Sequence, residues 1–317
     1  MAVIGSDFQY AKQLLDSDQL VAIPTETVYG LAGKAFSKKA VLKIFKAKNR
    51  PSFDPLIAHS DSIESIEQFV DYFPEKAKKL AEAFWPGALT LLLPKNKQIP
   101  DIMTSGLSTV AVRIPAHEMT LSLLQSLQYP LAAPSANPFG YVSPTTAQHV
   151  ENNLGDKIPY ILDGGSCSIG VESTIVGFEN DQPIVYRLGG LKIEQIEEVV
   201  GKIAIKNNQS SNPKAPGMVK SHYAPGKPIE IVDIQEKLSE ATTNLEKTGF
   251  ISFGNPPDAP YVVSLSDEQN LEEAAFKLFS ALRYFDTLPV DKIYTQLVPN
   301  TGIGRAINDR LQRAAAK

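Results

Sequence analysis

The sequence has 317 residues, of which 43% are apolar and 21% charged, and this balance is typical of a folded globular protein and excludes a disordered or collagen-like chain. The length suits two domains and is enough to bury a large core. The formal net charge of −4 argues against a protein whose main work is to bind a nucleic-acid backbone, because such binding needs many Lys and Arg side chains facing phosphates.

The first part of the chain, up to about Ala204, is predicted to form a mixed α/β sheet. Short runs rich in Val, Ile and Leu alternate there with helical patterns and with Pro/Gly turns. A helix is expected from about Ser37 to Lys48, with Ser37 as its N-cap, and another from about Ile193 to Ile203. Strands are predicted at 20–24, 55–59, 89–94, 109–115, 131–135, 160–165, 173–178 and 183–188. Many strands with only a few helices favour a twisted, mixed sheet.

Residues 205–228 are predicted to be a linker, because they are polar and rich in Asn, Ser and Pro. Beyond them strands and helices alternate, with strands predicted at 229–233, 249–254, 261–266 and 292–298 and helices near 235–247, 268–285 and 302–314. This alternation is typical of a small parallel-sheet domain of Rossmann-like character. No G-x-G-x-x-G follows its first strand, so dinucleotide binding is not supported.

Neither a membrane segment nor a metal centre is expected. The longest apolar run, at 88–93, is far shorter than the roughly 18 residues of a membrane helix, and the first ten residues do not have the pattern of a secretory signal. The single cysteine, Cys167, excludes an internal disulfide and fits a reducing compartment. The four histidines form no i, i+4 pair and have no companion cysteines, so no metal site is predicted. We therefore expect a cytoplasmic protein.

The common catalytic signatures are absent from the sequence. It contains no Walker loop, no G-x-S-x-G elbow and no H-E-x-x-H. The stretch GGSCSIG, at 164–170, is rich in glycine but is followed by Val171 and Glu172 instead of Lys-Ser, so we interpret it as a tight turn with a close approach of backbone. An enzyme with this sequence would use no common covalent nucleophile and no zinc ion.

A cluster of cations ends the first predicted helix. Lys46, Lys48 and Arg50 lie at its C-terminal end, just before a strand that contains His59. Such a cluster is more often a solvated helix end that interacts favourably with the helix dipole. It can also be a rigid anion clamp, in which Arg provides a planar fork for phosphate oxygens. The residues alone leave both interpretations open, and His59 is more often a buried core histidine than a ligand.

Small polar residues follow two of the predicted strands. Turn chemistry explains such residues as well as a ligand pocket at the ends of α/β strands does. Arg113 and Arg187 lie near the ends of two further strands, where a buried charge would be costly without an anion. The residues alone thus favour an α/β enzyme that binds one or more anions, with phosphate preferred. The small polar residues are Thr25, Glu26, Thr27, Ser135, Asn137 and Ser143.

Seven motifs, taken together and in order, resemble the two-domain form of the threonylcarbamoyl-AMP synthases. They are PTETVYGL, KAKNRPxxxPL, VAVRIP, PSAN, ESTIV, YRLG and PGMVKSHYAP. The resemblance covers nearly the whole chain, because ALRYFDTLPVDKIYTQLVPNTGIGRAINDRLQRAA is similar to the C-terminal domain of the family. It implies a YrdC-like catalytic domain with a twisted mixed sheet at 1–204, a linker and active-site lid at 205–228, and a small Rossmann-like domain at 229–317.

The resemblance also implies the reaction. Members of the family condense L-threonine, bicarbonate and ATP to threonylcarbamoyl-adenylate and pyrophosphate. The threonine amine captures bicarbonate as a carbamate, whose oxygen attacks the α-phosphate, with Mg²⁺ helping to neutralise the triphosphate. Orientation and charge stabilisation would carry the catalysis, so no nucleophilic side chain is needed. The product would pass to a complex that transfers the threonylcarbamoyl group to tRNA, and direct tRNA binding by this chain is left open.

Site residues are implied at the positions that match the family's motifs. L-Threonine is placed near Thr27, His59, Arg113, the backbone of Ala133, and Ser173. ATP is placed near Arg50, Asp54, Thr109, Ser135, Asn137, Ser143, Arg187 and Tyr223, and Lys48 and Arg50 are implied to be catalytic. Asp54 departs from the family, which often has Asn there. A carboxylate beside a phosphate would repel it unless Mg²⁺ or a ribose hydroxyl intervenes.

The end of the linker, PGMVKSHYAPGKP at 216–228, is expected to be a lid. It would bring Tyr223, with Lys220 and His222, to the nucleotide. The stretch MVKSHYAP replaces an aromatic-basic pair that some members have before the His-Tyr, so the role of residues 219–221 is left open. The sequence indicates no separate function for the second domain.

Two other functions compete with this interpretation. An RNA-binding module without ATP turnover would bind RNA tightly with a steep salt dependence, and the acidic balance counts against it. Carbamoyl transfer in hydrogenase maturation uses a similar domain together with zinc-finger cysteines, and this sequence has a single cysteine.

Overall fold

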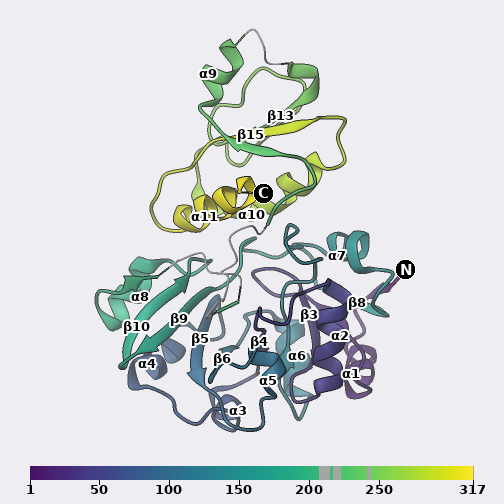
Figure 1. Cartoon of the computed structure of the whole chain (residues 1–317), viewed down its shortest axis with the longest axis vertical. Helices are drawn as coiled ribbons and strands as arrows, with labels where there is room; N and C mark the ends of the chain where they lie inside the picture. Colours follow the sequence, from purple (N-terminus) through teal and green to yellow (C-terminus); the bar gives the residue numbers. More distant parts are fainter. Residues whose placement is uncertain (207–214, 217–222, 241–243, 317) are drawn as a thin grey trace.

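The part of the chain that the structure describes forms two β-sheets. The computed structural model describes residues 1–206, 215–216, 223–240 and 244–316 (Figure 1). A large mixed sheet is built from residues before 206, and a small parallel sheet from residues after 228. The expected fold class, a mixed α/β sheet followed by a small parallel sheet, is confirmed. The domain boundaries at 204 and 229 stay predictions.

The strands of the large sheet lie in the order β1-β8-β2-β3-β7-β4-β6-β5-β9-β10-β11. Neighbouring strands pair in both orientations: β4 is parallel to β6, and β5 is antiparallel to β6. All of the predicted strands are present, most of them with shorter bounds. The bounds are β1 Val3–Gly5, β2 Val21–Ile23, β3 Gly30–Lys34, β4 Ile57–His59, β5 Leu89–Pro94, β6 Thr109–Arg113, β7 Leu131–Ala132, β8 Tyr160–Leu162, β9 Thr174–Glu179, β10 Gln182–Arg187 and β11 Ala204–Ile205.

Strand β3 is not among the strands expected from the sequence, because glycine is unfavourable inside a strand. Close packing requires its glycines. A Cβ atom on Gly33 would lie 3.0 Å from Leu20 Cδ2, and one on Gly30 would lie 3.2 Å from Ala133 Cβ. The approach of neighbouring elements therefore outweighs the low strand propensity. The short strands β1 and β11 are also absent from the expected set.

More helices accompany the large sheet than the sequence predicts. The expected helix at 37–48 is confirmed as α2, where Ser37 Oγ accepts a hydrogen bond from the Ala40 amide at 3.3 Å. The expected helix at 193–203 ends earlier, at Val200, because Gly201 takes a left-handed φ of 78°. The helices are α1 Phe8–Asp16, α2 Lys38–Lys48, α3 Ile63–Glu67, α4 Glu75–Phe84, α5 Asp101–Thr104, α6 Glu118–Gln125, α7 Ala147–Leu154 and α8 Ile193–Val200.

The small sheet has the strand order β12-β15-β13-β14, and each pair of neighbours is parallel. The predicted helix at 235–247 is two pieces, α9 and a 3₁₀ turn, and residues 241–243 between them lie outside the described residues. Helices α10 and α11 lie on the side of the small sheet that faces the large one (Figure 1). The bounds are β12 Ile229–Ile231, α9 Ile234–Ser239, η1 Leu245–Lys247, β13 Thr248–Ser252, β14 Val262–Ser264, α10 Leu271–Phe285, β15 Lys292–Thr295 and α11 Gly304–Ala315.

The two parts of the chain pack closely against each other. Gly170 has a φ of 85°, and a Cβ atom there would lie 2.5 Å from the carbonyl oxygen of Ala275 and 2.5 Å from Phe276 Cα, both in α10. The interpretation of 164–170 as a turn with a close backbone approach is thus confirmed. Apolar side chains of the first part, including Val28 and Val171, share one buried cluster with side chains of α10 and α11.

None of the helices in the described part of the chain combines the length and the apolar character that crossing a membrane requires.

Candidate active site

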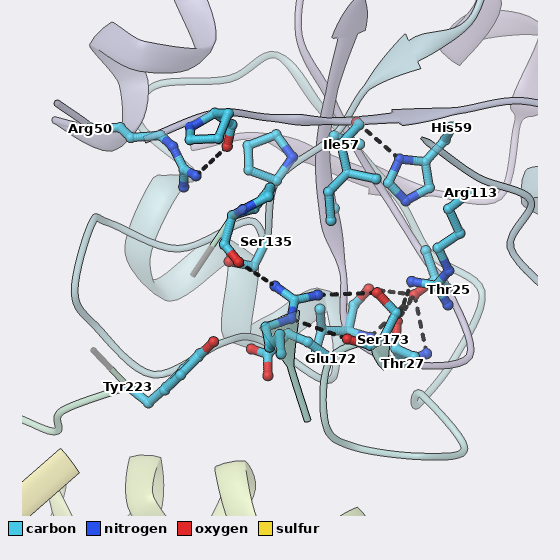
Figure 2. A pocket seen from close by; sticks show the side chains of 17 residues that line it. Thr25, Thr27, Arg50, Ile57, His59, Arg113, Ser135, Glu172, Ser173 and Tyr223 are labelled. Carbon is cyan, nitrogen blue, oxygen red and sulfur yellow. Dashed lines mark hydrogen bonds between the residues drawn. The ribbon is translucent and has the colours of Figure 1, made fainter. Parts of the chain in front are cut away.

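A pocket opens where several strands of the large sheet end (Figure 2). His59 and Arg113 are the last residues of β4 and β6 and lie opposite each other in a parallel pair, so the sheet places them together. The pocket is lined by Thr25, Thr27, Val28, Gly30, Arg50, Pro55, Ile57, His59, Arg113, Ala133, Pro134, Ser135, Glu172, Ser173, Arg187, Pro216 and Tyr223.

Arg113 is buried at one end of the pocket. Its Nη1 donates to Thr27 Oγ1 at 2.8 Å, its Nη2 forms an ion pair with Glu26 Oε1 at 2.6 Å, and its Nε donates to the Gly87 carbonyl at 3.1 Å. A guanidinium has five N–H donors, so two remain without a hydrogen bond to the described residues. The arrangement suits a ligand carboxylate held by two parallel hydrogen bonds.

His59, beside Arg113, is uncharged at ordinary pH. Burial, followed by the positive charge of Arg113, lowers the pKa of His59 to about 3. Its Nδ1 lies 3.3 Å from the Ile57 carbonyl, which indicates that Nδ1 carries the proton. His59 can therefore offer a neutral ring and its other nitrogen as an acceptor, but it cannot serve as a cation for an anionic ligand.

Ser173 connects the Arg113 end of the pocket to Arg187. Its hydroxyl lies 2.7 Å from Thr90 Oγ1 and accepts from Arg187 Nη2 at 3.1 Å. Arg187 also donates through Nε to the Ser173 carbonyl at 3.1 Å and through Nη1 to the Pro216 carbonyl at 3.3 Å. Burial lowers the pKa of Arg187, so an anion in the pocket would favour its charged form.

Arg50 lines the other side of the pocket, the side of Tyr223 (Figure 2). Its Nε donates to the Asp54 carbonyl at 2.9 Å and its Nη2 to the Pro55 carbonyl at 2.7 Å. Nη2 also lies 2.9 Å from the Asp54 carboxylate, which is buried and outside the lining of the pocket. The Nη1 group makes no hydrogen bond within the described residues and is available to an anion. Arg50 therefore supports the clamp interpretation over the solvated helix end.

Lys48 lies behind the pocket instead of in it. Its side chain is 1% exposed, and Nζ donates to the Ser135 carbonyl at 2.5 Å and to the Asn137 carbonyl. Asn137 donates in turn to the carbonyls of Pro138 and Tyr141, at 2.9 and 2.8 Å. Burial, followed by the charge of Arg50, lowers the pKa of Lys48 well below its usual range. Lys48 thus holds the loop that presents Ser135, whose hydroxyl makes no hydrogen bond within the described residues.

Glu172 is a lining residue that the sequence did not single out. Its Oε1 accepts from Ser143 Oγ at 2.5 Å, and its Oε2 pairs with Arg310 Nε at 2.8 Å. Both partners are distant in sequence, so no local pattern indicates this carboxylate as part of a site. Its position between a glycine-rich turn and Ser173, in the motif ESTIV, is the only signal available.

Two described residues of the linker lie at the pocket. Pro216 and Tyr223 both line it, and Tyr223 is 1% exposed. Lys220, His222 and residues 219–221 as a whole lie outside the described residues. The prediction that 216–228 form a lid stays a prediction.

The pocket brings together most of the predicted site residues, and several others lie outside its lining. Among the latter, Thr109 is the first residue of β6 whereas Arg113 is the last, which separates them by about 13 Å along the strand. The predicted contact of Thr109 with ATP stays a prediction. The lining includes Thr27, Arg50, His59, Arg113, Ala133, Ser135, Ser173, Arg187 and Tyr223, and it leaves out Lys48, Asp54, Thr109, Asn137 and Ser143.

Two family models match the chain. Residues 13–189 match a family described as "Telomere recombination", and residues 191–316 match "Threonylcarbamoyl-AMP synthase, C-terminal domain". Together they account for nearly all of the residues that form the two sheets.

Similar proteins cover the same span. A threonylcarbamoyl-AMP synthase of Pyrococcus abyssi is 44% identical over 94% of this chain and 90% of its own, and one of Bacillus subtilis is 43% identical over 96% and 92%. A crystal structure of P. abyssi Sua5 complexed with L-threonine matches with a TM-score of 0.93 and 41% identity, covering 99% of this chain and 97% of its own.

Proposed function

Because the chain belongs to the threonylcarbamoyl-AMP synthase family, it is an enzyme of the nucleotidyltransferase class, and we propose that it condenses L-threonine, bicarbonate and ATP to threonylcarbamoyl-adenylate and pyrophosphate. The observation that carries this proposal is a single pocket with cationic groups at both ends. Arg113 lies at one end, and Arg50 lies at the other together with Tyr223.

L-Threonine would bind at the Arg113 end. The two N–H donors of Arg113 that have no partner among the described residues fit the carboxylate as a bidentate pair. The hydroxyls of Thr27 and Ser173, the neutral ring of His59 and the backbone of Ala133 surround the space beside them. The related P. abyssi structure, complexed with L-threonine, supports an amino-acid site in this fold.

ATP would bind at the Arg50 end. Arg50 Nη1 and Arg187 supply positive charge for the phosphates, and the hydroxyl of Ser135 supplies a hydrogen bond. Tyr223 lines this end of the pocket beside the proposed nucleotide. Lys48 and Asn137 would act indirectly, because they fix the loop of Ser135.

The proposed reaction requires two bond-forming steps. The threonine amine attacks the carbon of bicarbonate, and hydroxide leaves and takes a proton from the amine nitrogen, so that a carbamate and water form. A carbamate oxygen then attacks the α-phosphorus of ATP, and pyrophosphate leaves. The role of the chain is to hold the two reactants in one pocket and to stabilise the negative charge on the transferring group through Arg50 and Arg187.

Mg²⁺ is part of the proposal, as an ion that neutralises the triphosphate. The oxygen donors of the pocket, such as the Ser135 hydroxyl, are of the hard type that Mg²⁺ accepts, so the residues present fit the ion. We propose that ATP phosphates and water supply most of its ligands. The product would pass to a tRNA threonylcarbamoyl-transfer complex, and we propose a cytoplasmic location because ATP and tRNA are found there.

The test is a direct synthesis. The purified full chain is incubated with ATP, Mg²⁺, L-threonine and labelled bicarbonate, and the adenylate is separated by chromatography while pyrophosphate is measured. Label should enter the adenylate only when all three substrates are present. Tight RNA binding without any adenylate would instead favour the RNA-binding alternative, and label transfer that does not depend on threonine would contradict the proposed substrate.

A further inference from the structure

Helix α11, in the second part of the chain, reaches the pocket through one arginine. Arg310 is fully buried, and its Nε pairs with Oε2 of the lining residue Glu172 at 2.8 Å. Its Nη1 lies 2.6 Å from Asp309 Oδ2, and its Nη2 donates to the Leu188 carbonyl at 2.9 Å. The guanidinium therefore joins two carboxylates and a backbone carbonyl in one plane, which a single ammonium could not do.

The same arginine holds Tyr223. The guanidinium carbon lies 4.8 Å from the centre of the Tyr223 ring, a cation–π distance, and Phe279 of α10 stacks on that ring at 5.7 Å and 22°. Tyr223 has a φ of 64°, a left-handed conformation that is unfavourable for an aromatic residue. Contacts from α10 and α11 thus surround a residue whose backbone would not take this conformation without support.

The charge of Glu172 explains why an arginine is needed there. Glu172 is 5% exposed and is the one carboxylate among the described residues that line the pocket. A buried carboxylate without a counter-ion would repel the phosphates of a nucleotide. Its Oε1 accepts from Ser143, which gives a hydrogen bond but no positive charge, so Arg310 supplies the neutralising charge from outside the large sheet.

We propose that Arg310 is a positioning residue for nucleotide binding, which neutralises Glu172 and fixes Tyr223, so that the second part of the chain completes the active site. The inference rests on the proposed function, because it takes the Tyr223 side of the pocket as the ATP site. It assigns the C-terminal part a role that no sequence motif indicates.

The experiment compares Arg310→Met with Arg305→Met in the full chain. Arg305 forms another ion pair between the two parts, with Glu194 at 2.6 Å, but it is partly exposed and does not line the pocket. Equilibrium dialysis with labelled ATP and adenylate synthesis are both measured. Arg310→Met should weaken ATP binding and raise the KM for ATP by about ten- to a hundredfold, because the Glu172 carboxylate would then face the phosphates without its counter-ion, while the KM for L-threonine stays within about twofold. Arg305→Met should match the wild type.

Charge rescue separates positioning from a merely structural role. Adding Glu172→Gln to Arg310→Met removes the uncompensated carboxylate and should recover most of the lost ATP affinity. A double variant that binds ATP no better than Arg310→Met, or an Arg310→Met with wild-type ATP affinity, would overturn the proposal. If Arg310→Met does not fold, Arg310→Lys replaces it, with an expected loss of about two- to tenfold in ATP affinity, and unchanged affinity in that folded variant would equally refute it.

Failure of the proposed function gives a different result. A wild-type chain that binds ATP but makes no adenylate would refute the synthesis, whereas the dialysis measurement would still test Arg310.

Discussion

Replacing Arg113 with Lys should reduce the affinity for L-threonine without changing the affinity for ATP. Lysine keeps the positive charge but loses the planar fork. Its single ammonium would pair with Glu26, which lies 2.6 Å from Arg113 in the wild type. Of the two N–H donors that Arg113 has for a carboxylate, at most one would then be replaced. The loss is one charge-assisted hydrogen bond, about 1.5–3 kcal/mol, or about ten- to 150-fold in the Kd for L-threonine.

Isothermal titration of L-threonine into wild type and Arg113→Lys measures this difference. L-Threoninol, which lacks the carboxylate, provides the control ligand: it should bind the wild type weakly, and the preference for L-threonine over L-threoninol should shrink in the variant. An ATP titration on both proteins shows whether the pocket is otherwise intact. Equal losses for ATP and L-threonine would point to general unfolding, and an unchanged preference would mean that Arg113 does not read the carboxylate.

Three further changes test other parts of the site. Lys48→Met leaves the carbonyls of Ser135 and Asn137 without their hydrogen-bond donor, so the free energy of unfolding should fall by about 1–3 kcal/mol. Urea unfolding measures this loss, and a variant as stable as the wild type would contradict the role of these contacts. The pKa of His59 is about 3 in the folded chain and near 6.5 in the unfolded chain, so between these pH values the unfolded chain binds one more proton. The free energy of unfolding should therefore fall as the pH drops below 6.5. This loss should reach about 2 kcal/mol at pH 5, and His59→Asn should remove it in urea unfolding at pH 7 and 5. Tyr223→Ala should raise the KM for ATP and leave the Kd for L-threonine within about twofold in titrations, since Tyr223 lies on the Arg50 side; a loss confined to L-threonine would reverse the assignment of the two ends.

Apolar runs and turn residues predict most of the strands, because each strand is short and buried. They do not predict β3, where tight packing against Leu20 and Ala133 selects glycine against strand propensity. The polar residues after strands proved informative: Thr27, Ser135 and Arg113 meet in one pocket because the ends of neighbouring strands lie at one edge of the sheet.

The part of the site that the sequence did not reveal depends on contacts between distant segments. The pair of Glu172 and Arg310 joins residues 138 positions apart, and no local spacing indicates it. The sequence also gave no sign that Lys48 turns away from the pocket toward two carbonyls, because a cation at the end of a helix can take either direction.

The close contact of Gly170 with α10 helps to set the distance between the first part of the chain and α10. No side chain fits between Gly170 and the backbone of Ala275 and Phe276, and the lining residue Glu172 lies only two positions further along. A methyl group at position 170 would act as a wedge that pushes α10, and with it Phe279 behind Tyr223, away from the nucleotide side. Because residue 170 has only a hydrogen atom in place of a side chain, its backbone can approach that of α10 closely. This close approach helps to set the position of the Tyr223 ring.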